Sequence, residues 1–147
     1  MKNLFGFSWT GFLIVLFPMV PNLFYYLFPN KLQATKHGAN HSFLNLLEHS
    51  NQFIFIGLLI CVPIDQSVSI NSGYVIAIAL FLFSYYGLWI FLFKENTNLF
   101  ILICMAILPV CYFTLAEIWL HSFFAILPTL IFGAVHVLIT YLDFYQS

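Results

Sequence analysis

Residues 43–56 read FLNLLEHSNQFIFI, so five consecutive polar side chains (EHSNQ) interrupt a strongly apolar run. The uninterrupted apolar part that follows, 53–64, is about 12 residues long, whereas a helix needs roughly 20 residues to cross a bilayer. A helix that begins at Ser42, a suitable N-cap, has about 23 residues and a length of about 34 Å. We therefore predict one membrane helix over residues 42–64, with the polar residues inside it.

A second interpretation of this stretch stays open. Residues 43–52 can form an amphipathic helix at the membrane surface, with the five polar side chains in water. The membrane span then begins near Gln52 and has to continue through Pro63 and past Asp65. The two interpretations differ in whether the carboxylate and the imidazole of this stretch lie inside the membrane.

The composition is that of a membrane protein. Hydrophobic residues make up 63% of the 147 residues and charged residues 6%, whereas soluble domains have about 25% charged residues. The apolar residues form long blocks and do not alternate with polar ones over about ten residues, as membrane β-strands do. We predict an all-α fold, namely a polytopic integral membrane bundle of about five transmembrane helices in a lipid bilayer.

We predict that residues 1–147 form a single transmembrane domain. The predicted spans cover residues of about 4–28, 42–64, 73–93, 98–119 and 123–144, and residues 29–41 form a cytoplasmic loop. No Ala-x-Ala-like cleavage site follows the first apolar run, so we interpret it as a retained span. Pro18 and Pro21 predict a kink in this span, which is tolerated in a membrane when neighbouring helices satisfy the freed carbonyls.

The lysines predict the orientation. Lys31, Lys36 and Lys94 fall on one side of the membrane, and Lys2 falls on the other. By the positive-inside tendency, the N-terminus lies outside and the C-terminus in the cytoplasm. The chain has no arginine and is rich in residues with A/T-rich codons, a pattern that favours a bacterial source and the inner (plasma) membrane.

The polar residues of the second span follow a helical period. Asn45, Glu48, His49 and Gln52 are spaced i, i+3, i+4 and i+7, which predicts that they share one helix face. Glu48 lies about six residues, or about 9 Å, from the cytoplasmic end of its helix.

Two other spans bring polar groups to the same level. His136 and Asn22 lie about seven and six residues from the cytoplasmic ends of their own helices. An isolated charge in hydrocarbon costs several kcal/mol, so we predict a contact of Glu48 with His136 or with Asn22. The candidate ligand-binding residues are Glu48, His136, His49, Asn22, Gln52, Tyr25 and Tyr85.

We also make predictions for two residues that lie outside this level, Glu117 and Gly133. Glu117 lies near the outer end of its span, where we expect its carboxylate to reach water. Gly133 has small or polar neighbours one turn away and is expected to let the last span approach another helix closely.

Several classes of function are not indicated. The net charge of -1 and the absence of a basic cluster argue against nucleic acid as a partner. Cys104 and Cys111 are too far apart along one helix to form a disulfide, and no Cys-x-x-Cys is present. His37 and His41 are spaced i, i+4 in the predicted loop, which is a weak metal signal, and no phosphate loop or nucleophile elbow appears. We therefore predict no catalytic residue, no metal and no cofactor.

Three segments carry a resemblance. FGFSWTGFLIVLFPMVPNLFYYLFP, LLEHSNQ and ILPVCYFTLAEIWLHS are similar to a family of small multi-span bacterial membrane proteins, over the whole chain. That resemblance implies a membrane bundle and carries over no activity and no functional residue. The five-span architecture is also similar to the tryptophan-rich sensory proteins and to the sterol-isomerase-like membrane domain. The motifs of neither are present, and architecture alone does not define function.

Three hypotheses of function follow. In the first, the protein binds or transports a small amphipathic or lipid-like molecule, with Glu48 as charged anchor or proton acceptor. In the second, it is an accessory subunit that packs on a larger membrane protein or on copies of itself. In the third, it is a lipid-modifying enzyme in which Glu48 and a histidine act as acid and base, which requires these groups to lie within reach of each other.

Overall fold

The computed structural model describes residues 6–27, 41–61, 72–94 and 98–146, and within these ranges the chain is helical and contains no strand. The five helices are α1 (Trp9–Leu27), α2 (Ser42–Cys61), α3 (Ser72–Phe93), α4 (Leu99–Trp119) and α5 (Phe123–Gln146). The predicted all-α class is therefore confirmed.

Four of these helices, α2 to α5, are long and apolar enough to cross a membrane. The first helix is shorter, and its apolar part covers Trp9–Phe24. The protein therefore has the character of an integral membrane protein, with α1 as the shortest element of the bundle.

The first helix begins later than predicted, at Trp9 instead of near residue 4. The reason is that the preceding segment bonds to the end of α2 instead of continuing the helix. The backbone N–H groups of Gly6 and Ser8 donate to the carbonyls of Cys61 and Ile60, at 3.0 and 2.8 Å. Carbonyls at a helix C-terminus lack intrahelical donors, so this pairing satisfies two of them.

The second helix is continuous from Ser42 through the polar stretch to Cys61, as predicted from its length. Residues 62–64 of the predicted span, and nearly all of the predicted loop 29–41, lie outside the described residues. At the other end of the chain, α5 continues to Gln146, two residues beyond the predicted end.

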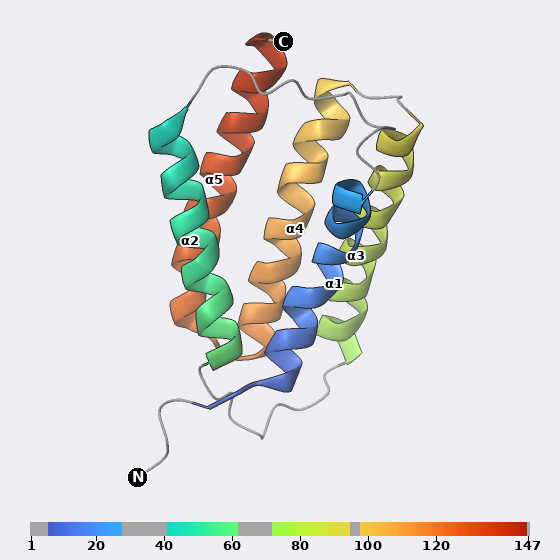
Figure 1. Ribbon diagram of the computed structural model, residues 1–147. Helices are drawn as coiled ribbons and strands as arrows, with labels where there is room; N and C mark the ends of the chain where they lie inside the picture. Colours follow the sequence, from blue (N-terminus) through green and yellow to red (C-terminus); the bar gives the residue numbers. More distant parts are fainter. Residues whose placement is uncertain (1–5, 28–40, 62–71, 95–97, 147) are drawn as a thin grey trace.

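The helices α2, α5, α4 and α3 lie side by side in that order, and α1 packs on one face of this layer (Figure 1). Neighbours in the layer run antiparallel. The start of α2 and the end of α5 therefore lie at the same end of the bundle, whereas α4 ends and α5 begins at the opposite end (Figure 1). Because α1 contacts α2, α3 and α4, its shape decides what space remains in the middle of the bundle.

The first helix is bent, as its two prolines predict. Pro18 and Pro21 lie inside it, and Figure 1 shows its last turns directed away from the line of its first turns. Each proline removes one N–H donor, so the carbonyl four residues earlier loses its helical partner.

Two tyrosines supply the missing donors. The hydroxyl of Tyr112, on α4, donates to the carbonyl of Ile14 at 3.0 Å, and that of Tyr86, on α3, donates to Phe17 at 2.6 Å. Ile14 and Phe17 are the residues four positions before the two prolines. The bend of α1 is thus anchored to α3 and α4, in the way that membrane helices require.

Two glycines permit close helix contacts. A Cβ atom on Gly11 would lie 2.0 Å from the carbonyl oxygen of Leu59, so α1 and α2 touch backbone to backbone there. A Cβ atom on Gly133 would lie 2.6 Å from a methyl group of Val110, which confirms the predicted close approach of α5. The approach is to α4 of the same chain, so the close contact at Gly133 belongs to the packing of helices within this chain.

Candidate functional site

The predicted contact between Glu48 and a histidine is confirmed. Nδ1 of His136, on α5, lies 2.6 Å from Oε1 of Glu48, on α2. The Glu48 side chain is 12% exposed and the His136 side chain 38% exposed. The pair therefore joins two helices and still leaves the imidazole open on one side.

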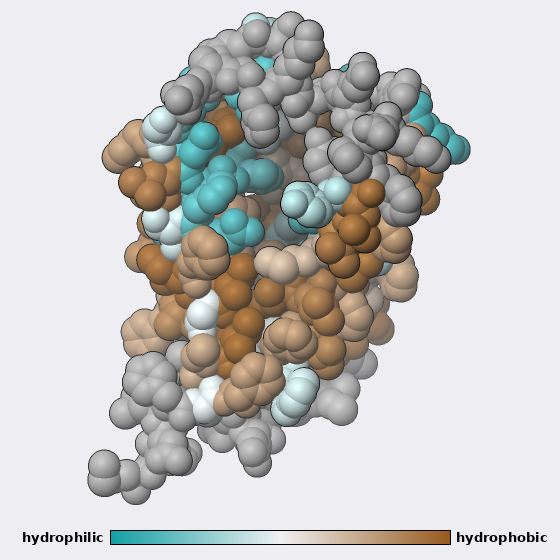
Figure 2. Space-filling view, in the orientation of Figure 1, coloured by the Kyte–Doolittle hydropathy of each residue, from teal (hydrophilic) through white to brown (hydrophobic). Residues whose placement is uncertain are grey.

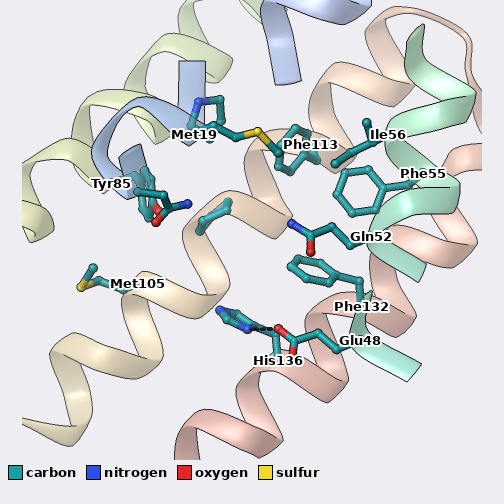
Figure 3. Close-up of a pocket in the computed structure, with 13 residues that line it drawn as sticks. Met19, Glu48, Gln52, Phe55, Ile56, Tyr85, Met105, Phe113, Phe132 and His136 are labelled. Carbon is teal, nitrogen blue, oxygen red and sulfur yellow. Dashed lines mark hydrogen bonds and ion pairs between the residues drawn. The ribbon is translucent and has the colours of Figure 1, made fainter. Parts of the chain in front are cut away.

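The position of the imidazole is fixed by its neighbours. The ring stacks on Phe132, one helical turn earlier on α5, with ring centroids 5.4 Å apart and an interplanar angle of 12°. Glu48 engages Nδ1, and the opposite edge of the ring points into the space between the helices (Figure 3). With its proton on Nδ1, the imidazole presents an Nε2 acceptor to that space, and with protons on both nitrogens it presents a donor.

This space is a cavity of about 160 Å³ to which all five helices contribute. Figure 2 shows hydrophilic side chains gathered over the upper part of α2, with the surface hollowed beside them toward α1. The cavity is lined by Pro18, Met19, Asn22, Glu48, Gln52, Phe55, Ile56, Tyr85, Met105, Pro109, Phe113, Phe132 and His136.

The lining mixes polar and aromatic side chains. Glu48 and His136 lie together, the Phe132 ring lies beside this pair on the side toward Gln52, and Tyr85 lies across the cavity (Figure 3). The phenylalanine rings form one cluster, in which Phe55 lies 5.0 Å from Phe113 and 5.5 Å from Phe132, centroid to centroid. A molecule in this cavity would meet hydrogen-bonding groups and aromatic rings at once, as in most small-molecule sites.

Five of the seven predicted ligand-binding residues line this one cavity, and they come from four helices. They are Asn22 on α1, Glu48 and Gln52 on α2, Tyr85 on α3 and His136 on α5. The Tyr85 hydroxyl also interacts with the Asn22 side chain. The Tyr25 side chain lies outside the described residues.

Asn45, Glu48, His49 and Gln52 share one face of α2, as predicted, because the helix is continuous. Of these four, Glu48 and Gln52 line the cavity, whereas Asn45 and His49 are exposed and lie outside the lining. The buried line of this helix passes through Glu48, Asn51, Phe55 and Leu59. His49 follows Glu48 directly, so its side chain is turned by about 100° away from that line. Sequence reasoning missed Asn51, which is buried, and its amide donates to the carbonyl of Leu47 at 2.8 Å.

The interfacial interpretation of residues 43–52 expects all five polar side chains to lie in water, and for two of them this expectation is wrong. Glu48 and Asn51 are buried, and α2 runs through them without a break. Ser50, like His49, is exposed, so the stretch has one buried polar side and one exposed polar side.

The prediction for Glu117 is wrong, since its side chain is fully buried. Thr129, on α5, donates a short hydrogen bond to its Oε1, and Oε2 has no partner among the described residues. The cause is the tight link between α4 and α5, in which His121 adopts a left-handed conformation with φ of 56°. This turn folds α5 directly over the end of α4 and closes the path from Glu117 to water.

The chemistry of the cavity is limited to a few groups. Glu48 and His136 lie within the reach that acid–base catalysis requires, but the lining residues include no serine, threonine or cysteine as a nucleophile. Within the described ranges, no three His, Cys, Asp or Glu side chains are grouped to hold a metal ion.

These observations define a helical membrane protein with an amphipathic cavity between its helices. No known protein family, no curated protein and no solved structure matches this chain. Its function therefore has to be argued from the cavity itself.

Proposed function

We propose that this protein is a binding or transport module for a small amphipathic or lipid-like molecule, which occupies the cavity between the five helices. The observation that carries the proposal is the Glu48–His136 pair, at 2.6 Å, in the lining of a cavity that also presents aromatic rings. In this role Glu48 is the anchor, His136 adjusts its charge, and Gln52, Asn22 and Tyr85 add hydrogen-bonding groups around the ligand.

The alternative role of such a pair is to hold helices together, as polar side chains do in membranes. Helix packing alone favours a pair that is enclosed and a packed interior without large voids. Here the imidazole stays 38% exposed and a cavity of about 160 Å³ lies beside it. Both features support a ligand site over a purely structural contact.

The proposal also includes the membrane environment of the protein and its orientation. Large apolar side chains are exposed on all five helices, which fits a lipid environment. We place the protein in the inner (plasma) membrane with its N-terminus outside and its C-terminus in the cytoplasm. In that orientation the Glu48–His136 pair lies on the inner-leaflet side of the cavity, since α2 begins and α5 ends at that end of the bundle, while Phe55, Phe113 and Phe132 lie nearer the middle of their helices.

The test is native mass spectrometry of the protein released from mild detergent. A reproducible additional mass is expected on the wild type, and Glu48→Gln is expected to lose it. A steric variant, Met19→Trp, fills the cavity from α1 and is expected to lose the same mass. The matched control is Leu16→Trp, which adds an indole to the same helix at a position that is exposed and outside the lining.

Circular dichroism and size-exclusion chromatography establish that the variants are folded. A wild type without bound mass, or a mass retained equally by Glu48→Gln and Met19→Trp, contradicts the proposal. A bare oligomer in the same spectra would instead favour the accessory role.

A further inference from the structure

Few side chains in the lining of the cavity can carry a charge. Its described lining includes no lysine or arginine, and its titratable groups are Glu48 from α2, His136 from α5 and Tyr85 from α3. The lining residues of α1 and α4 bring no titratable side chain. His49, the nearest other titratable residue in sequence, is exposed and outside the lining. The net charge of the site is therefore decided by the Glu48–His136 pair.

This pair is neutral when it holds one shared proton. The proton is located either on the imidazole, beside a carboxylate, or on the carboxyl group, beside a neutral imidazole, and in both states the total charge is zero. Loss of that proton leaves one negative charge between membrane helices, which is strongly unfavourable without a compensating cation. A bound monovalent cation compensates the negative charge as the proton did.

From this balance we infer that the cavity takes a monovalent organic cation with a compact aromatic or apolar body, and that its binding releases the shared proton of the Glu48–His136 pair. The proton leaves to the aqueous phase, and the cation takes its place beside the carboxylate. The inference rests on the proposed function, since it names the class of molecule that the same cavity binds.

The walls of the cavity fit such a ligand. Phe55, Phe113, Phe132 and Tyr85 present aromatic rings to the space, and aromatic faces attract ammonium groups. With the shared proton gone, Nε2 of His136 is an acceptor for an ammonium N–H. The volume of about 160 Å³ matches one six-membered ring, as a cavity of about 150 Å³ holds benzene in another protein.

Anionic ligands fit poorly. The one group in the described lining that can carry a positive charge is His136, and its imidazole is already engaged by Glu48 at 2.6 Å. A phosphate or carboxylate would add negative charge beside a carboxylate. The inference thus separates cationic from anionic amphiphiles and ranks neutral ones between them.

The experiment compares benzylamine, benzyl alcohol and benzoate, which share one ring and differ in head-group charge. Binding to the full chain in nanodiscs of zwitterionic lipid is measured by isothermal titration calorimetry, in two buffers of different ionisation enthalpy. Benzylamine is expected to bind at least about tenfold more tightly than benzyl alcohol and to release about one proton per molecule bound. Its affinity is expected to rise with pH, by up to about tenfold per pH unit, while the pair still holds its proton.

Three variants complete the design. Glu48→Gln is expected to remove the preference for benzylamine and the proton release together. His49→Gln, the adjacent exposed histidine, is expected to leave both unchanged. Met19→Trp is expected to block binding of benzylamine and benzyl alcohol alike.

The outcomes separate the inference from the proposed function. Equal binding of benzyl alcohol and benzylamine without proton release, both blocked by Met19→Trp, overturns the inference and leaves a neutral-ligand cavity. Tightest binding of benzoate also overturns the inference. Absence of binding by all three probes overturns it too, and the bound mass of the wild type, measured independently, then decides whether the cavity has a different ligand.

Discussion

Glu48 and Glu117 are both buried carboxyl groups that form a hydrogen bond with a side chain of α5, but they lie at opposite ends of the bundle. Their partners on α5, His136 and Thr129, are seven residues apart and therefore lie on the same face of that helix. Glu48 meets a basic imidazole beside a cavity, whereas Glu117 meets a neutral hydroxyl in a closed contact.

The difference shows how one helix face can support two roles for the same residue type. Glu48 has a partner that can carry a positive charge and a cavity beside it, which are the two features that support the proposed ligand site. Glu117 has neither a basic partner in its hydrogen bond nor exposed surface, so the interpretation that fits it is structural. Its carboxyl group joins the ends of α4 and α5 where the chain turns.

The largest expected effect is on ligand binding, and it should separate the two acids completely. Glu48→Gln is expected to weaken binding by at least about 100-fold, because a ligand that loses a buried charged partner gives up about 2–5 kcal/mol of binding free energy. Glu117→Gln keeps the shape of the side chain far from the cavity and is expected to change binding by less than about twofold. Native mass spectrometry of the retained mass measures both, and equal losses would contradict the assigned roles.

The second prediction concerns the stability of the fold, which should depend on the Glu117–Thr129 pair. Thr129→Val removes the hydroxyl that donates to the Glu117 carboxyl and is expected to destabilise the fold by about 2–3 kcal/mol, since a buried polar group then lacks its partner. The double variant Glu117→Leu/Thr129→Val replaces both groups by apolar ones and is expected to recover most of that loss. Unfolding followed by circular dichroism during titration with a denaturing detergent measures the difference.

A double variant as unstable as Thr129→Val alone would argue against a structural role for this pair. The comparison with His136→Gln is informative, because His136 is 38% exposed and a glutamine amide can still donate to Glu48. That variant is expected to cost about 2 kcal/mol of stability, because the hydrogen bond is kept and the charge of the partner is lost.

Much of this arrangement follows from the sequence by counting along helices. The helix through the polar stretch was predictable because its apolar part alone cannot cross a membrane. The contact of Glu48 with His136 was predictable because both lie at a similar depth, and unpaired charges are excluded from hydrocarbon. The bend of α1 was predictable from Pro18 and Pro21.

Other features depend on neighbours that a single helix does not reveal. Which side of α2 is buried depends on where α5 packs, so the sequence alone did not reveal that Asn51 is buried and His49 exposed. The burial of Glu117 depends on the left-handed turn at His121, which depth counting does not include. The cavity itself is the space left by the bend of α1, so Met19 and Met105 in its lining carry no recognisable pattern in the sequence.

The smallest expected effect tests whether the two pairs share one support. Gly133 lies between Thr129 and His136 on α5, and there a Cβ atom would lie 2.6 Å from Val110. Gly133→Ala is therefore expected to push α5 from α4 and to destabilise the fold by about 1–2 kcal/mol. A Cβ atom on Gly57 meets nothing within 4 Å, so Gly57→Ala is the matched control and is expected to be neutral or slightly stabilising.

If the cause is the contact with Val110, the second substitution Val110→Ala should restore part of the stability of Gly133→Ala, because it removes the methyl groups that the new Cβ atom meets. Displacement of α5 moves both hydrogen-bond donors of its shared face, so Gly133→Ala should also weaken ligand binding, by about threefold to tenfold. Thermal unfolding and bound mass, measured on the same samples, connect the two effects. Loss of stability with full retention of binding would show that the positions of His136 and Thr129 are set independently, and that α5 does not act as one rigid support.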